Sequence, residues 1–166
     1  MERKSALLAL AVLCVLAAGG VSAASFTANN VSELRAHITT SNGNTGSDTI
    51  TVVAGTFTLS GAAGENSNGS GDLDIIRTGG SLVIEGAGVG QTIIDGGNVD
   101  RVFHVNMSGG ATVTFRDLTI QGGSAVDNGT NGSEARGAAI LNESGSDITL
   151  ESVEILTCST SGPPGA

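Results

Sequence analysis

Aromatic side chains are nearly absent from this chain, which has no Trp or Tyr and only four Phe among 166 residues. Helix-forming Lys and Glu are also scarce, whereas Gly occurs 26 times. The apolar residues are mostly Val, Ile, Leu and Ala, and with Gly they favour many short strands joined by tight turns. This composition argues against a helical bundle. The lack of aromatic platforms also weakens a sugar-binding interpretation, although polar side chains could still bind a glycan.

Basic residues and cysteines are few. Seven Lys and Arg stand against sixteen Asp and Glu, so the net charge is −9. A surface of this sign repels nucleic acid and anionic lipid, and we expect no nucleic-acid partner. Of the two cysteines, Cys14 lies in a predicted leader and only Cys158 remains beyond it. No internal disulfide is therefore expected, and no role is assigned to the lone thiol of Cys158.

The first 23 residues have the pattern of a secretory signal peptide. Arg3 and Lys4 form the positive end, an apolar run covers 7–18, and residues 21–23 are an A-x-A-like cleavage site. The run is shorter than the ~20 residues that a membrane span needs. Cleavage would leave five basic and fifteen acidic residues, a net charge of −10. We therefore expect a secreted protein, extracellular or at the cell surface, with no membrane span in the mature chain.

Residues 24–48 are predicted to form an N-terminal segment with a short helix that begins near Val31. Ser32 is suited to be its N-cap, and Leu34 and Ile38 share one face at i, i+4 spacing. A helix of two turns is not stable alone. We expect Leu34 and Ile38 to pack on the exposed end of a stack of strands, which makes this a capping helix.

The centre of the chain repeats a pair of very short strands. Apolar residues alternate within each copy, and the copies are offset by 31 and 35 residues with polar loops of variable length between them. Fixed apolar positions joined by variable loops are typical of a solenoid. We predict an all-β, right-handed parallel β-helix over 49–158 and a disordered tail over 159–166. The matched positions are Leu82 and Ile84; Val113, Phe115, Leu118 and Ile120; and Ile148, Leu150, Val153 and Ile155.

The chain stops one strand pair after the last copy. Residues 148–156 would present an unpaired strand edge and apolar surface, which repeat proteins normally cap. We expect that this sequence is a truncated or N-terminal portion of a longer protein, or that its end associates with another molecule, including end-to-end self-association.

Several short segments occur in a specific order and span most of 25–156. They include VSELRAHI at 31–38, TIIDGG at 92–97 and LTIQGG at 118–123, together with 47–51, 54–57, 71–75, 84–88 and 101–104. In this order they resemble the N-terminal part of bacterial surface β-helix proteins of the CSLREL-domain, polymorphic-outer-membrane-protein-like type, in the pectin-lyase-like superfamily. That family often carries cysteines where this chain has residues 31–33, so an N-terminal disulfide is not expected. The resemblance implies a surface location and a scaffold or adhesin role, without established chemistry.

Asp72 and Asp74 lie at i, i+2 and would project from one face of a strand. Two such carboxylates could hold Ca²⁺, which takes several oxygen ligands, or flank a glycosidic bond. A solvated strand face has the same pattern, and it is the interpretation that we favour. No cofactor is required, and Ca²⁺ stays an alternative.

Asp95, Asp100, Arg101 and His104 are the best candidates for acid–base chemistry. Resemblance to polysaccharide lyases of this fold would imply acidic calcium ligands with a basic proton acceptor, and resemblance to glycosidases would imply several close aspartates. The motifs typical of pectinolytic glycosidases are missing. We expect Arg101 to pair with a carboxylate at a turn and His104 to lie at the surface.

Two functions follow. The favoured one is a secreted or cell-surface scaffold with a structural or adhesive role, whose partner is an extracellular polysaccharide or a component of a host or cell surface. The alternative is a carbohydrate-active β-helix enzyme, a polysaccharide lyase or glycosidase, that uses the candidates above. A calcium-stabilised module is a third possibility.

Overall fold

The computed structural model of this chain describes residues 22–126, 135–143 and 146–162. The predicted signal peptide lies almost entirely outside these ranges. The described residues form one helix and twelve strands. In chain order these are β1 (Ser25–Ala28), α1 (Val31–Asn42), β2 (Ser47–Val52), β3 (Gly55–Thr58), β4 (Leu73–Ile75), β5 (Ser81–Glu85), β6 (Thr92–Asp95), β7 (Phe103–Asn106), β8 (Thr112–Gln121), β9 (Ser124–Val126), β10 (Ile140–Glu143), β11 (Asp147–Leu156) and β12 (Ser159–Ser161).

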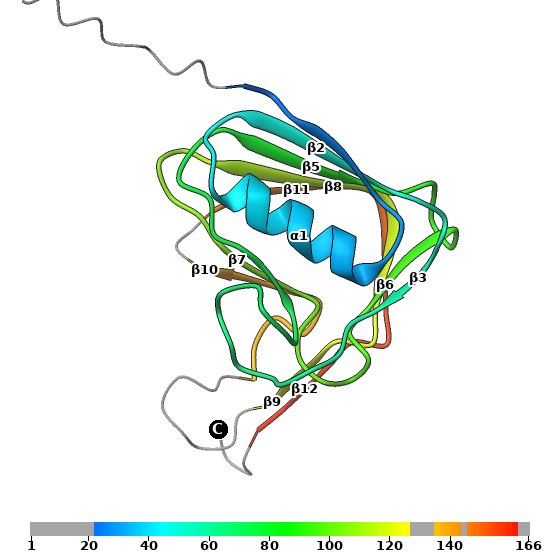
Figure 1. The fold of residues 1–166 in the computed structure, drawn as a ribbon. Helices are drawn as coiled ribbons and strands as arrows, with labels where there is room; N and C mark the ends of the chain where they lie inside the picture. The colour runs from blue at the N-terminus through cyan, green and yellow to red at the C-terminus, as the bar shows by residue number, and fades with distance from the viewer. Residues whose placement is uncertain (1–21, 127–134, 144–145, 163–166) are drawn as a thin grey trace, which may run out of the picture.

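The strands stack in parallel on three faces of a solenoid (Figure 1). The first face runs from β1 through β2 and β5 to the first halves of β8 and β11, and the second joins β3 and β6 to their second halves. The third face is β4, β7 and β10. Because each passage round the faces brings the chain back beside its own earlier strand, the fold is a parallel β-helix of about three turns. The predicted fold class is confirmed.

The register of the strands is the one that the sequence repeat predicts. Leu82 and Ile84 pair with Val113 and Phe115, and these pair with residues 148 and 150 of β11. β8 and β11 each turn the corner between the first two faces at one residue of positive φ, Asp117 (φ 53°) and its equivalent at 152 (φ 52°). Asp tolerates this left-handed conformation better than most residues.

The core consists of the inward side chains of the three faces. Phe57, Phe103 and Phe115 all point inward and are at most 3% exposed, as predicted. The rings of Phe103 and Phe115 lie tilted against each other with centroids 4.5 Å apart, which joins the third face to the first across the interior.

Helix α1 covers the first turn of the solenoid (Figure 1) and packs against β1, β2 and β4. Leu34 and Ile38 are fully buried, so the expected capping helix is confirmed. Its N-cap is Asn30 rather than Ser32, because the Asn30 side chain accepts a hydrogen bond from the Glu33 N–H at 2.9 Å. Asn30 and Glu33 have the spacing of a capping box, which favours the earlier start. The helix is also longer than expected and runs to Asn42.

A buried ion pair fixes the end of α1 to β2. Arg77 and Asp48 are both shielded from solvent, and the Arg77 Nη1 lies 2.9 Å from Asp48 Oδ2. Arg77 also donates hydrogen bonds to Ser41 on the last turn of α1. The two buried charges of this pair therefore compensate each other.

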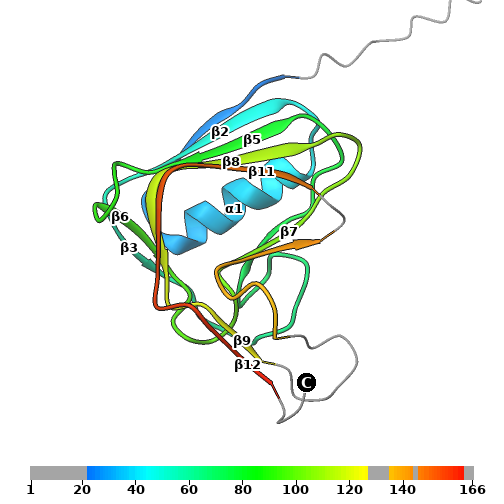
Figure 2. The same cartoon turned by 180° about the vertical axis from the view of Figure 1, so that it is seen from behind.

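The other end of the stack is formed by β11 (Figure 2). Leu150 and Ile155 continue the buried rows of Phe115 and Ile120 in β8, yet they are 47% and 46% exposed, and Leu156 beside them is 41% exposed. Among the described residues nothing covers them as α1 covers the first turn. Residues 159–161, expected to belong to a disordered tail, form β12 beside β9. No helix in the described ranges is long and apolar enough to cross a membrane.

Candidate functional site

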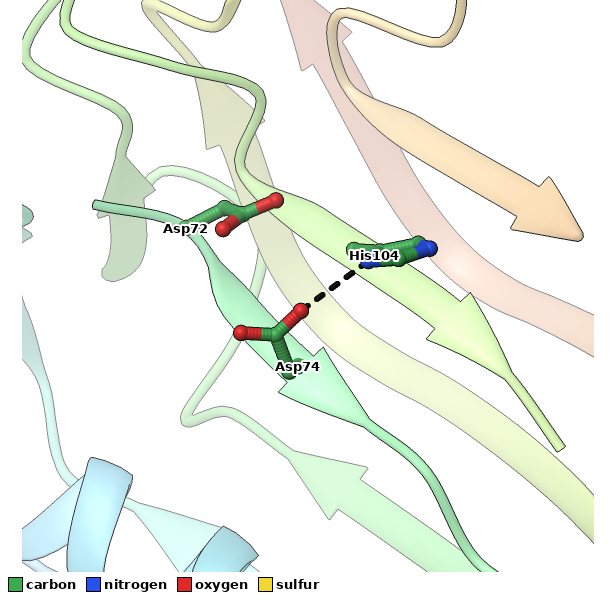
Figure 3. Close-up of side chains that lie close together, drawn as sticks. All are labelled: Asp72, Asp74 and His104. Carbon is green, nitrogen blue, oxygen red and sulfur yellow. Dashed lines mark hydrogen bonds and ion pairs between the residues drawn. The ribbon is translucent and has the colours of Figure 1, made fainter. Parts of the chain in front are cut away.

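Asp72, Asp74 and His104 come together on the third face of the solenoid (Figure 3). Asp74 lies in β4 beside His104 of β7, with which it is in register, and Asp72 immediately precedes β4. One potential ligand atom from each residue lies within 4.8 Å of the other two. Both carboxylates are 0% exposed and the imidazole residue is 4% exposed.

This burial corrects the expectation of a solvated strand face and of a surface His104. The loop 60–71 folds over the outer side of β4 and closes on it. The Asn68 N–H donates to Asp74 Oδ2 at 2.7 Å, and the Gly64 N–H donates to Asp100 Oδ2 at 2.7 Å. Alternation along a strand tells which side chains point outward, but it does not tell what covers them.

Helix α1 holds the same loop from its other side. The Asn68 side-chain amide donates to the Arg35 carbonyl at 2.8 Å and to Thr39 Oγ1 at 2.9 Å. The Arg35 guanidinium donates to the Asp72 and Gly71 carbonyls at 2.6 and 2.8 Å. Loop and helix therefore enclose the cluster together.

Asp72 carries a carboxylate that lacks hydrogen bonds. Neither of its oxygens has a hydrogen-bond partner among the described residues, and the nearest cation is Arg101, whose Nη1 lies 3.8 Å from Oδ2. Burial raises the pKa of Asp72, and the negative charges of Asp74 and Asp100 raise it further, to about 7, against the opposing effect of Arg101 and His104. Near neutral pH this group is poised between its two protonation states.

His104 lies between two carboxylates. Its Nδ1 is 3.0 Å from Asp74 Oδ1, and its Nε2 is 3.1 Å from Oε2 of Glu143 on β10. The hydrogen bond with Asp74 raises the pKa of His104 more than burial lowers it, and Glu143 adds to the rise. The hydrogen bond with Asp74 therefore holds the imidazole through Nδ1, whereas Nε2 lies close to Glu143 without making a hydrogen bond.

Five of the six predicted site residues belong to this region. Arg101 pairs with the carboxylate of Asp72, as expected of it, and Asp100 accepts hydrogen bonds from the N–H groups of Gly64 and Arg101. Asp95 is the exception. It lies on β6 in the second face, where Gln121 and Gly97 donate to its two oxygens at 2.8 Å. Asp95 is therefore not brought together with the other candidates for acid–base chemistry, Asp100, Arg101 and His104.

Two residues of the site were not predicted. Glu143 lies on β10, a strand that the sequence did not reveal because it follows a long variable loop. Asn68 lies in a polar loop without periodicity, where it adopts a positive φ of 61°. The complete arrangement of two carboxylates and one imidazole can share protons or hold a divalent cation. A polymeric substrate would have to displace the loop 60–71 to reach it.

Comparison with protein families, with curated proteins and with solved structures gives no match for this chain. The resemblance to CSLREL-type surface proteins therefore stays a prediction, and the chain is placed at the level of its fold, a parallel β-solenoid.

Proposed function

We propose that this chain is a secreted or cell-surface β-helix scaffold with an adhesive role. The observation that carries the proposal is the enclosure of Asp72, Asp74 and His104 beneath the loop 60–71. The side chains best suited to acid–base chemistry are closed off from solvent, whereas the outward side chains of the first face, on β2, β5 and β8, are at least partly exposed. Repeat proteins use such extended faces to bind partners.

The order of the segments that resemble CSLREL-type surface proteins supports the same role, as does the predicted signal peptide. The predicted mature chain has a net charge of −10, so the partner that fits it best is a neutral or cationic component of a cell surface or an uncharged extracellular polysaccharide.

The adhesive role is tested by retention. Labelled mature chain, residues 24–166, is incubated with intact cells of the source strain and with neutral and acidic polysaccharides immobilised on beads. We expect retention on cells or on a neutral polysaccharide, with no change in the length of the polysaccharide. The matched control is Phe115→Asp, which places a charge in the fully buried core and should unfold the solenoid. Retention of neither protein on any surface contradicts the proposal.

The location is tested separately. The whole 166-residue chain is expressed in the source strain, and the extracellular, surface and intracellular fractions are probed. We expect a product that begins at Ala24 in the first two fractions. An intracellular product that retains Met1 contradicts secretion.

The second candidate function is a carbohydrate-active enzyme. It is favoured by the raised pKa of Asp72, about 7, beside His104 and Arg101, because general acids and bases work best when their pKa lies near the working pH. The mature chain is incubated with polygalacturonate and other acidic glycans, with and without Ca²⁺. We expect no release of unsaturated or reducing ends. Release that disappears in Arg101→Ala would establish the enzyme instead of the scaffold.

A further inference from the structure

Asp72, Asp74 and His104 offer three potential ligand atoms within 4.8 Å of one another (Figure 3). Zn²⁺ binds carboxylate oxygen and imidazole nitrogen at about 2.0–2.2 Å, so small rotations of the side chains suffice to bring the three atoms onto one ion. We propose that these residues bind a divalent transition-metal ion of the Zn²⁺ class. The proposal does not depend on the adhesive role.

The carboxylate of Asp72 is the independent observation that points to a ligand. It is fully buried, neither oxygen accepts a hydrogen bond from the described residues, and the nearest guanidinium nitrogen is 3.8 Å away. Burial of an ionised carboxylate is costly unless it is paired or coordinates a metal. A cation between Asp72 and Asp74 would compensate the charge that Arg101, 3.8 Å from Asp72, balances only in part.

Asp74 and His104 are already held as ligands would be. Asn68 occupies Oδ2 of Asp74, which leaves Oδ1 directed at Nδ1 of His104 at 3.0 Å. The other imidazole nitrogen, Nε2, lies 3.1 Å from Glu143 Oε2 without making a hydrogen bond. A histidine that binds a metal through one nitrogen commonly donates the other N–H to a carboxylate, which fixes its tautomer and orientation. A turn of the Glu143 side chain would let it accept this N–H, and that makes Glu143 the positioning residue of the site.

The imidazole decides which ion fits. Asp72 and Asp74 alone suggested Ca²⁺, but Ca²⁺ takes six to eight oxygen ligands. A set of two carboxylates and one imidazole is instead typical of Zn²⁺ and its neighbours in the first transition row. Asp100 adds negative charge nearby, and Arg101 opposes it. The structure thus changes the candidate ion as well as the ligand set.

The proposal is tested with Zn²⁺ alone as the probe. The mature chain is stripped with a chelator, dialysed, and titrated by calorimetry and by thermal melting. We expect one Zn²⁺ per chain and a raised melting temperature, because an ion that binds only the folded state stabilises it. Ca²⁺ at the same concentration should give a smaller shift. A Co²⁺-loaded sample should show visible absorption bands.

Four variants locate the ion. Asp72→Asn and His104→Gln each remove a ligand and should weaken Zn²⁺ binding by about 100-fold or more, and Glu143→Gln should weaken it about 10- to 100-fold. The matched control is Asp117→Asn, the same chemical change at the corner of β8, where φ is 53° and Asn is readily accommodated. Its affinity should equal that of the parent.

The metal-free variants are also melted, because Asp72→Asn removes a buried charge and should still fold cooperatively. Three results would overturn the site: Zn²⁺ binding that Asp72→Asn and His104→Gln leave unchanged, a Ca²⁺ effect that exceeds the Zn²⁺ effect, or no effect of any of these ions on the stripped parent chain.

Discussion

Two buried aspartates, Asp48 and Asp72, each lie beside an arginine, yet their surroundings differ. Asp48 is 1% exposed and Asp72 is 0% exposed. Asp48 accepts hydrogen bonds from Arg77 at 2.9 Å and from Ser41 at 2.6 Å, and its other oxygen accepts one from the Ala24 N–H at 3.0 Å. Asp72 accepts none, and its arginine stands 3.8 Å away.

The pKa values of the two carboxyl groups move in opposite directions. Burial on its own would raise both. At Asp48, hydrogen bonds from Ser41 and Arg77 outweigh burial, and the pKa lies below its ordinary value. At Asp72, burial is reinforced by Asp74 and Asp100, and the pKa rises to about 7. A nearby opposite charge is therefore not enough to lower the pKa of a buried carboxyl group. Direct hydrogen bonds decide whether the ionised carboxylate stabilises the fold.

The two aspartate sites should differ most in the stability that is lost when the arginine of each is removed. Arg77→Met leaves Asp48 buried and unpaired, and should lower the free energy of unfolding by about 3–5 kcal/mol. Arg101→Met removes only a distant contact from a group that can take up a proton, and should cost about 1 kcal/mol. Urea unfolding of chelator-treated protein at pH 7 measures both. Equal losses would contradict the comparison.

The second largest effect should be the change in the free energy of unfolding with pH. An acid whose pKa is raised on folding stabilises most below its unfolded pKa of 3.8 and loses that contribution as pH rises through the folded value, about 7. Between pH 4 and 7 the loss should be on the order of 3 kcal/mol, at 1.36 kcal/mol per pKa unit. The raised pKa of His104 adds a loss of the same sign once pH rises above its ordinary value of 6.5.

Below pH 4.5 the slope should reverse. The hydrogen bonds of Ser70, Ser67 and Gly69 overcome the effect of burial and hold the pKa of Glu65 at about 2, so its contribution is lost as pH falls toward that value. Chelator-treated protein should therefore be most stable near pH 4 to 5. Urea unfolding across pH 3–8 checks this, and Asp72→Asn should flatten the upper limb. A parent chain most stable above pH 7 would contradict the raised pKa of Asp72.

Replacing each aspartate by Asn should change the free energy of unfolding in opposite directions. At pH 8 Asp48→Asn loses a carboxylate that three donors satisfy and should cost about 1–3 kcal/mol. Asp72→Asn removes a buried charge that makes no hydrogen bond and should raise the free energy of unfolding by on the order of 1 kcal/mol or more. Thermal melting of both variants without metal measures this. A loss in both would mean that Asp72 has partners that compensate its charge.

The contrast between these aspartates also separates what the sequence predicts from what it does not. Stacked apolar positions are predictable, because a repeat offset of 31 or 35 residues fixes the register directly: Leu82 pairs with Val113, and Val113 with Ile148. The helix is predictable from Leu34 and Ile38, but two good N-caps stand close together and only the reciprocal contact with Glu33 selects between them.

Burial of charge is not predictable in this way. Asp72, Asp74 and His104 can be named from their residue types, yet their enclosure depends on where the loop 60–71 packs, and no periodicity encodes that. Arg77 gives no signal at all, because a lone arginine is normally solvated. At both sites the partner that decides the state of the carboxylate, Arg77 or His104, lies about 30 residues away in the sequence.

The smallest effect should come from an arginine in solvent. On the first face Arg116 lies between Glu85 and Glu151, 3.7 Å from each, and these side chains are 36–51% exposed. Exposed pairs contribute little and are screened by salt. Arg116→Gln should cost less than about 1 kcal/mol, and the cost should vanish at about 1 M NaCl. The cost of Arg77→Met should persist at that salt concentration. Urea unfolding at low and high salt measures both. If salt does not change the cost of Arg116→Gln, Arg116 stabilises the fold through the packing of its side chain and not through its charge, and the contrast with Arg77 fails.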